Sequence, residues 1–151
     1  MNSVVIYAST SGNTRTVAEA ILVALEARGP ARLVPVSEAT STPDADLVVL
    51  GAPTEGHTVS KAMAGWMGSL ASMAFSGRRV AVFDTRLGWP RFLSGSAADE
   101  MARRVEALGG ELVAPPQSFI VSMKPALEPG ELERATAWAA DLADALVATA
   151  A

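Results

Sequence analysis

Cysteine is missing from this chain of 151 residues, which excludes disulfide bonds, thiolate metal sites and cysteine nucleophiles together. Histidine occurs once, at His57, and no second strong ligand is spaced with it, so we expect no metal site. Basic residues number 12 against 16 acidic ones and form no block. The charge pattern therefore indicates neither nucleic acid nor an anionic membrane surface as a partner.

Long hydrophobic runs are also missing. No stretch approaches the roughly 20 apolar residues that cross a bilayer. The first apolar run, residues 4–8, is too short for the core of a signal peptide and has no basic segment before it. Hydrophobic residues nevertheless make up 50% of the chain, most of them aliphatic or alanine, which is typical of a packed domain. We expect one domain over residues 1–151, in the cytoplasm and without a membrane partner.

Apolar runs of strand length alternate with helical patterns along the chain. The runs at 3–8, 46–51 and 79–84 lack polar alternation, which predicts strands buried on both faces. The run at 32–36 contains Pro35, which favours an edge strand, and residues 111–114 and 118–121 predict a fifth strand interrupted by two prolines. Helices are expected at 13–28, 60–74 and 96–108. A last helix follows residues 128–130, with its inner face formed by Leu132, Ala135, Ala139, Leu142 and Leu146.

This order of elements predicts the α/β class, with three layers built around a doubly wound, five-stranded parallel sheet.

A polar loop joins the first predicted strand to the first predicted helix. The start of a helix presents unpaired N–H groups and partial positive charge, and Gly12 allows a sharp turn toward an anion. One hydroxyl is enough to cap a helix, whereas four hydroxyls surround this glycine, so we interpret the loop as a phosphate site. The P-loop ending and the three-glycine dinucleotide fingerprint are both absent. The loop consists of Ser9, Thr10, Ser11, Gly12, Asn13 and Thr14.

Residues 7–20, YASTSGNTRTVAEA, closely resemble the phosphate-loop signature of the flavodoxin family. That signature carries hydroxyl residues at positions 9, 11 and 14 and glycine at position 12. The order of elements resembles the flavodoxin fold over the whole chain, and the short fifth strand resembles its short-chain type. Segments such as 83–86 and 112–119 look like a subgroup common in actinobacteria. The resemblance implies the strand order 2-1-3-4-5 and flavin mononucleotide (FMN) as the cofactor.

The resemblance also implies two ring loops that sandwich the isoalloxazine ring of the flavin. The first ring loop comprises Ala52, Pro53, Thr54, Glu55, Gly56 and His57. The second comprises Thr85, Arg86, Leu87, Gly88 and Trp89.

Three of these side chains leave alternatives open. Trp89 either stacks on the flavin or packs in a hydrophobic patch over a helix. His57 is either a solvated loop residue or a group that covers the flavin face, and Glu55 stands where many flavodoxins carry tryptophan. Arg86 is either a solvated or ion-paired side chain, with Glu55 or Asp84 as its partner, or a cation close to the pyrimidine edge of the flavin.

We expect no catalytic residue, because no acid–base pair or nucleophile stands out. The resemblance then implies an electron-transfer flavoprotein that exchanges electrons with redox partner proteins, a reductase and an acceptor. Two alternatives remain: an NAD(P)H-dependent quinone or nitro reductase, and a weakly flavin-binding domain used for partner contact.

Overall fold

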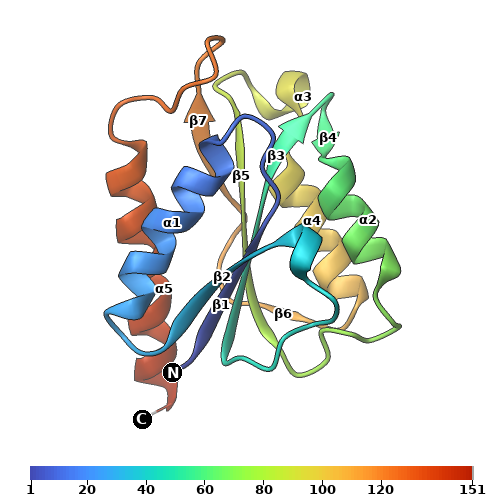
Figure 1. Ribbon diagram of the computed structural model, residues 1–151, viewed down its shortest axis with the longest axis vertical. Helices are drawn as coiled ribbons and strands as arrows, with labels where there is room; N and C mark the ends of the chain where they lie inside the picture. Colours follow the sequence, from blue (N-terminus) through green and yellow to red (C-terminus); the bar gives the residue numbers. More distant parts are fainter. Residues whose placement is uncertain (151) are drawn as a thin grey trace.

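A mostly parallel β-sheet forms the middle layer of the protein, and helices cover both of its faces (Figure 1). The structure is a computed structural model that describes residues 1–150. The order of the sheet is β2-β1-β3-β5, and the last position is divided between β6 and β7. This confirms the predicted order 2-1-3-4-5, with an interrupted fifth strand. The strands are β1 Ser3–Tyr7, β2 Ala31–Pro35, β3 Leu47–Glu55, β5 Arg79–Leu87, β6 Glu111–Leu112 and β7 Gln117–Val121.

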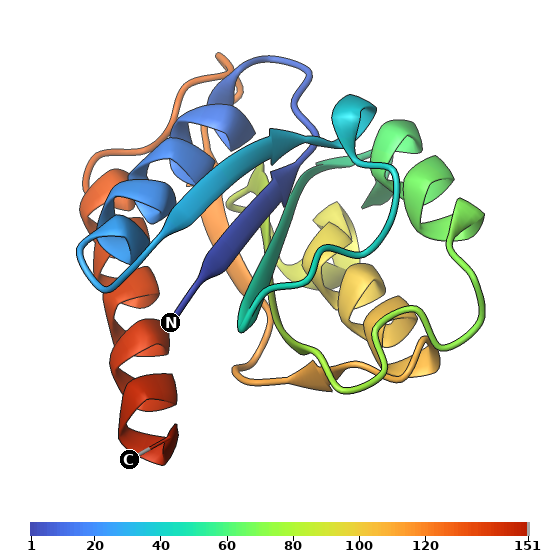
Figure 2. The same ribbon diagram turned by 60° about the horizontal axis from the view of Figure 1, so that its bottom comes forward.

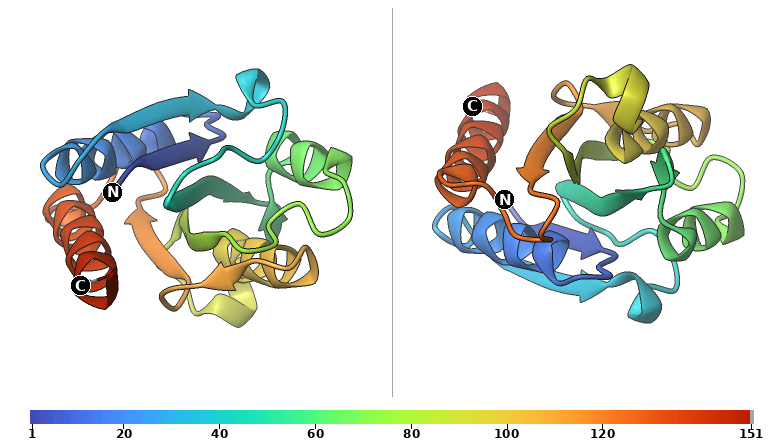
Figure 3. Two further views of the ribbon diagram at one scale, coloured as in Figure 1. Left: turned by 90° about the horizontal axis from the view of Figure 1, so that it is seen from below. Right: turned by 90° about the horizontal axis from the view of Figure 1, so that it is seen from above.

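The helices divide between the two faces of the sheet, as both views in Figure 3 show. Helices α1 (Asn13–Glu26) and α5 (Glu131–Ala150) lie side by side on one face. Helices α2 (Lys61–Ser69) and α4 (Ala97–Ala107) cover the other. Two short helices, η1 (Val36–Glu38) and α3 (Arg91–Ser94), follow the C-terminal ends of β2 and β5. Figure 2 shows β2 at the sheet edge beside β1; Pro35 ends this edge strand in register with Tyr7, and an edge position tolerates its missing N–H.

Each central strand contributes to two hydrophobic cores, because successive side chains point to opposite faces. In β3, Val48 and Leu50 pack toward α2 and α4, while Leu47 and Val49 pack toward α1 and α5. All four side chains are fully buried. The prediction of strands covered on both faces is therefore confirmed.

Two central strands are longer than predicted. β3 continues to Glu55 because Thr54 and Glu55 pair with the short antiparallel strand β4 (Thr58–Val59). β5 continues to Leu87 because β7 pairs with it over residues 83–87. Much of both expected ring loops is therefore strand, and this fixes the backbone more firmly than a free loop would.

Two helical expectations were wrong. α2 ends at Ser69 rather than near residue 74, because Leu70, the next residue, takes an extended conformation. The glycines at 65 and 68 also lower the helix propensity of this segment. Leu132 is 37% exposed rather than on the inner face of α5. The first turn of α5 is held instead by Glu131, whose carboxylate accepts hydrogen bonds from the Ile120 N–H and from Arg134.

Candidate functional site

The predicted site residues gather where β1, β3 and β5 end, the upper end of the molecule in Figure 1. The phosphate loop follows β1, the first ring loop forms the end of β3, and the second follows from the end of β5. In a parallel sheet the loops at the carboxyl ends of the strands form the ligand site. The topology therefore brings the three predicted segments to one edge.

The phosphate loop is open and rich in free donors. Gly12 takes the left-handed conformation (φ 93°) and precedes α1, and no side chain caps the helix there. The Gly12 N–H bonds to Ser9 Oγ at 3.1 Å. Within residues 1–150, the N–H groups of Ser11, Asn13 and Thr14 make no hydrogen bond. The loop thus leaves a row of unpaired N–H donors at the positive end of α1.

Gly12 is needed for its backbone conformation rather than for room. A Cβ atom built on Gly12 would meet no atom within 4 Å. A positive φ of this size is rarely adopted by other residues, so a side chain would strain the turn. It would also stand in the open space in front of the free N–H groups.

Thr14 differs from the rest of the loop because its side chain is buried. Its hydroxyl lies 2.8 Å from the hydroxyl of Thr85 on β5. Ser9, Thr10 and Ser11 are exposed. Thr14 and Thr85 therefore tie the phosphate loop directly to the second ring loop, a contact that sequence patterns did not reveal.

The first ring loop is a tight β-hairpin. Glu55 pairs with Thr58 across a two-residue turn, in which Gly56 (φ 54°) and His57 (φ 72°) are both left-handed. His57 is exposed at the tip and bridges to Gly95. The Glu55 carboxylate accepts a hydrogen bond from the Thr10 hydroxyl, so it is held by the phosphate loop.

Glu100 on α4 holds the far strand of this hairpin. Its carboxylate accepts bonds from the Thr58 hydroxyl and, at 3.0 Å, from the Val59 N–H. Burial alone would raise the pKa of Glu100, but these bonds and Arg104 outweigh burial and lower the pKa. The carboxylate form, which can only accept, is the one that holds the hairpin.

Arg86 organises the second ring loop. Its guanidinium donates to Ser118 Oγ (3.0 Å), to the carbonyls of Leu87 (3.1 Å) and Trp89 (2.8 Å), and to Ser94 Oγ (3.2 Å). Among the described residues it forms no ion pair, so the alternative partners Glu55 and Asp84 were wrong. Arg86 is a partly buried cation that fixes the loop through neutral oxygens.

Trp89 stands beside an apolar surface. Its side chain is 48% exposed, and those of Phe92 and Leu93 are 85% and 49% exposed. Trp89 is thus about half exposed, which leaves part of the residue uncovered. Its stacking on a flavin stays a prediction.

Asp84 was not expected to matter beyond a possible pairing with Arg86. It is fully buried on β5, one residue before Thr85. One carboxylate oxygen, Oδ2, accepts three hydrogen bonds, and the other, Oδ1, has no partner within residues 1–150. The signal in the sequence was an acidic residue closing the apolar run RVAVFD.

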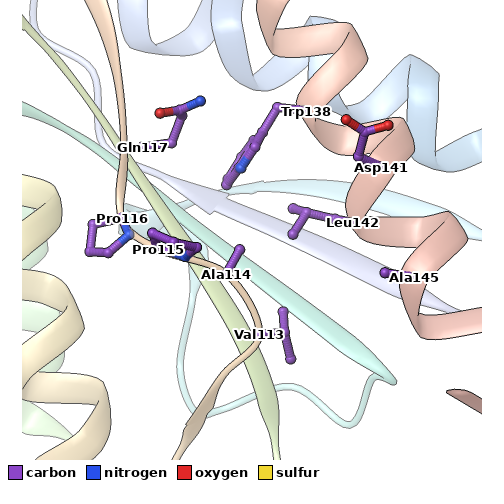
Figure 4. Close-up of a pocket in the computed structure, with 9 residues that line it drawn as sticks. All are labelled: Val113, Ala114, Pro115, Pro116, Gln117, Trp138, Asp141, Leu142 and Ala145. Carbon is purple, nitrogen blue, oxygen red and sulfur yellow. The ribbon is translucent and has the colours of Figure 1, made fainter.

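Two hollows differ in their relation to this site. One of about 410 Å³ adjoins the phosphate loop and is lined by residues that include Ser9, Thr10, Gly12 and Arg15. The other, of about 330 Å³, lies between the β6–β7 segment and α5, with Pro115 and Pro116 on one side and Trp138 and Leu142 on the other (Figure 4). It contains none of the predicted site residues.

The described part of the chain contains neither a cluster of metal ligands nor a membrane-spanning helix. Residues 1–150 contain no group of three or more His, Cys, Asp and Glu side chains placed to hold a metal ion. Over the same residues, no helix combines the length and apolar character needed to span a membrane.

The fold is an α/β sandwich in which the loop before α1 and the ends of β3 and β5 meet at one edge of the sheet. The family model described as Flavodoxin matches residues 5–144, and the chain belongs to the flavodoxin family. The prediction that the chain is a member of the flavodoxin family is thus confirmed, and the family assignment supports FMN as the cofactor.

Solved structures show the same fold at low sequence identity. Oxidised flavodoxin 1 from Bacillus cereus has 20% identity and a TM-score of 0.78, over 95% of this chain and 98% of that one. A flavodoxin from the domain Archaea has 20% identity and a TM-score of 0.80, over 97% and 99%. Rubredoxin:oxygen oxidoreductase from Desulfovibrio gigas has 18% identity and a TM-score of 0.76, over 99% of this chain but only 37% of that one. No curated protein sequence matches the chain.

Proposed function

We propose that this protein is an electron carrier that binds FMN and passes electrons between a reductase and an acceptor protein. The observation that carries the proposal is the row of free N–H groups at the start of α1, in a chain of the flavodoxin family. When bound, FMN supplies the redox chemistry, and the protein binds it, orients it and sets its electrostatic surroundings.

The phosphate would be held without a basic side chain in the loop. Residues 9–14 contain no lysine or arginine, and Arg15 is paired with Glu19 at 2.8 Å on the exposed face of α1. Backbone N–H groups at a helix N-terminus, together with hydroxyls, are sufficient to bind a phosphate monoester. The residues that we assign to the phosphate are Ser9, Thr10, Ser11, Gly12, Asn13 and Thr14.

The ring would lie between the two ring loops. Trp89 offers a partly exposed aromatic face, and the backbone of the Gly56–His57 turn presents polar groups at the hairpin tip. Arg86 adds positive charge from the second ring loop. We assign the ring contacts to residues 52–57 and 85–89.

FMN retention tests this function. Purified protein should be yellow, with flavin absorption bands that survive desalting. The purified holoprotein should oxidise NAD(P)H only at the slow rate of free flavin, and should accept electrons rapidly from a flavodoxin reductase. A colourless protein that binds no added FMN would contradict the proposal, whereas steady NAD(P)H oxidation would favour a reductase.

A further inference from the structure

The three hydrogen bonds to Asp84 Oδ2 come from two different parts of the site. Ser96 Oγ (2.7 Å) and the Ala98 N–H (3.0 Å) belong to the start of α4. Thr54 Oγ1 (3.3 Å) belongs to the first ring loop. The carboxylate of Asp84 therefore lies at the junction between the first ring loop and α4.

Both hydroxyls at this junction are used twice. Thr54 Oγ1 donates to Asp84 and accepts from the Ala97 N–H at 2.9 Å. Ser96 Oγ donates to Asp84 and accepts from the Asp99 N–H at 3.2 Å. A carboxylate only accepts hydrogen bonds, so the hydroxyl hydrogens of Thr54 and Ser96 both point toward Asp84. Each hydroxyl oxygen then has a lone pair free to accept from a helix N–H group. Without Asp84 neither hydroxyl would have a fixed orientation.

Helix capping does not explain a buried carboxylate here. Ser96 already caps α4, and one oxygen acceptor is enough for that purpose. Burial of a carboxylate is costly, and among the described residues no basic side chain lies within ion-pair distance of Asp84. The positive end of α4 and three donors offset part of that cost.

The next residue on β5 after Asp84 connects this junction to the phosphate loop. Thr85, the next residue, contacts Thr14 of the phosphate loop. Successive side chains of a strand point to opposite faces, so two adjacent residues hold two different loops. Asp84 fixes the first ring loop and Thr85 fixes the phosphate loop, and one peptide bond sets the spacing between them.

We propose that Asp84 is a positioning residue that locks the first ring loop to α4, so that the seat for the isoalloxazine ring is formed before the flavin binds. The proposal rests on the proposed function, because it concerns how this chain presents its ring loops to FMN. A preformed seat increases affinity by removing the ordering cost at binding. The lock acts on the ring half of the ligand and not on its phosphate.

The experiment compares FMN with riboflavin, which lacks the phosphate, by fluorescence-quench titration of apoprotein. Asp84→Ala should weaken binding of both flavins by the same factor, about tenfold, and leave their affinity ratio unchanged. Asp84→Asn should recover only part of the lost affinity, because its carboxamide oxygen offers two acceptor lone pairs to the three donors and its NH2 group has no acceptor among the described residues at the place of Oδ1. Thr54→Val should weaken both flavins, and the double variant should bind no more weakly than Asp84→Ala alone.

Ser3→Ala is the control for loss of a buried polar group. Ser3 is buried at the opposite end of β1, and its hydroxyl has no hydrogen-bond partner among residues 1–150. This variant should leave both affinities unchanged. Circular dichroism would verify the fold of each variant, and Thr54→Val carries the same test if Asp84→Ala does not fold.

Two results would overturn the proposal. One is wild-type affinity for both flavins in Asp84→Ala, or in Thr54→Val if the alanine variant is unfolded. The other is a loss confined to FMN, which would place the effect at the phosphate. Wild-type apoprotein that binds neither flavin would instead overturn the proposed function, and this inference with it.

Discussion

Thr14 and Thr85 join the first helix to the central sheet through hydroxyls 2.8 Å apart, and both side chains are buried. The contact connects the loop assigned to the phosphate with the strand that leads to the second ring loop. One of the two hydroxyls donates in this pair, and Thr14 can use its remaining capacity at the phosphate.

Thr85→Val should lower the free energy of unfolding by about 1 kcal/mol or more, because it leaves the buried Thr14 hydroxyl without its partner. Urea denaturation of the apoprotein measures this loss. Thr14→Val should affect FMN binding more than Thr85→Val does, because it also removes a phosphate donor. Equal stability of Thr85→Val and wild type would show that the hydroxyl contact contributes nothing.

FMN should bind more tightly than riboflavin by several kcal/mol, since charge-assisted hydrogen bonds contribute roughly 1.5–3 kcal/mol each. The same titrations should show weaker binding of FAD, whose phosphates are not monoesters. Equal affinity for FMN and riboflavin would remove the assignment of residues 9–14 to the phosphate.

Gly12→Val should abolish FMN binding in a chain that still folds. A Cβ atom at this position meets no described atom within 4 Å, so we expect the defect to come from the left-handed backbone and from a side chain placed beside the free N–H groups. Gly65→Val, on the open side of α2, is a matched glycine control that should retain binding. Wild-type affinity in Gly12→Val would mean that the anion binds elsewhere.

Arg86→Ala should lower the semiquinone-to-hydroquinone potential of bound FMN by some tens of millivolts. A cation near the flavin stabilises the reduced anion, and about 1.4 kcal/mol corresponds to ~59 mV for one electron. Arg86→Glu should lower it further. Arg86→Lys separates the effect of charge on the potential from the effect of loop geometry. It keeps the positive charge but loses the guanidinium that donates to the carbonyls of Leu87 and Trp89.

Spectroelectrochemical titration at one pH and ionic strength measures these potentials. Unchanged values in both the alanine and the glutamate variants would show that Arg86 acts only on the shape of the loop. A fall in the lysine variant as large as that in alanine would lead to the same conclusion.

Glu131 should contribute a pH-dependent part of the stability. The hydrogen bond from Arg134 lowers the pKa of Glu131 below the ordinary 4.5. Burial opposes this shift, and the hydrogen bond from the Ile120 N–H adds to it. A lowered folded-state pKa stabilises the protein above the unfolded-state pKa, and the contribution is lost as pH falls through the folded-state value. Wild type should therefore lose more stability than Glu131→Gln between pH 5 and pH 3, by urea denaturation at about 0.5-unit steps.

Parallel pH profiles for the two proteins would contradict this assignment. Glu133→Gln, an exposed acidic position on the same turn of α5, is the control and should follow the wild-type profile.

The α/β class and the buried strands were predictable because both depend on local patterns, whereas the strand order was implied by the resemblance to the flavodoxin family. Continuous apolar runs mark buried strands, and the glycine-and-hydroxyl loop precedes an amphipathic helix. Contacts between distant residues were not predictable in this way. Thr54, Asp84 and Ser96 meet only after β3, β5 and α4 are packed; an acidic residue at the end of an apolar run marks Asp84 as unusual, but the local sequence does not indicate its partners.

The ring loops show the same limit. An ion pair with Glu55 or Asp84 was one of the alternatives for Arg86, yet its guanidinium is held by the carbonyls of its own loop and by Ser94 and Ser118. Charge alone suggested an ion pair, whereas the folded loop surrounds the guanidinium with neutral oxygens. Leu132 was misplaced because Glu131 anchors the helix start, a contact across eleven residues.

The divided last strand has a consequence for how molecules of this protein meet one another. Pro115 and Pro116 interrupt the outer strand, so β6 pairs with only two residues of β5 before β7 resumes at Phe83. At the other border of the sheet, Pro35 removes a donor from β2. Neither border offers a long uninterrupted row of backbone donors and acceptors, which is what a second chain needs to extend the sheet. The fold thus discourages fibre-like stacking of its own copies at high concentration, and the side chains of Glu131 and Arg134 add to this effect by bonding to the backbone of Ile120 and Ser118 on β7.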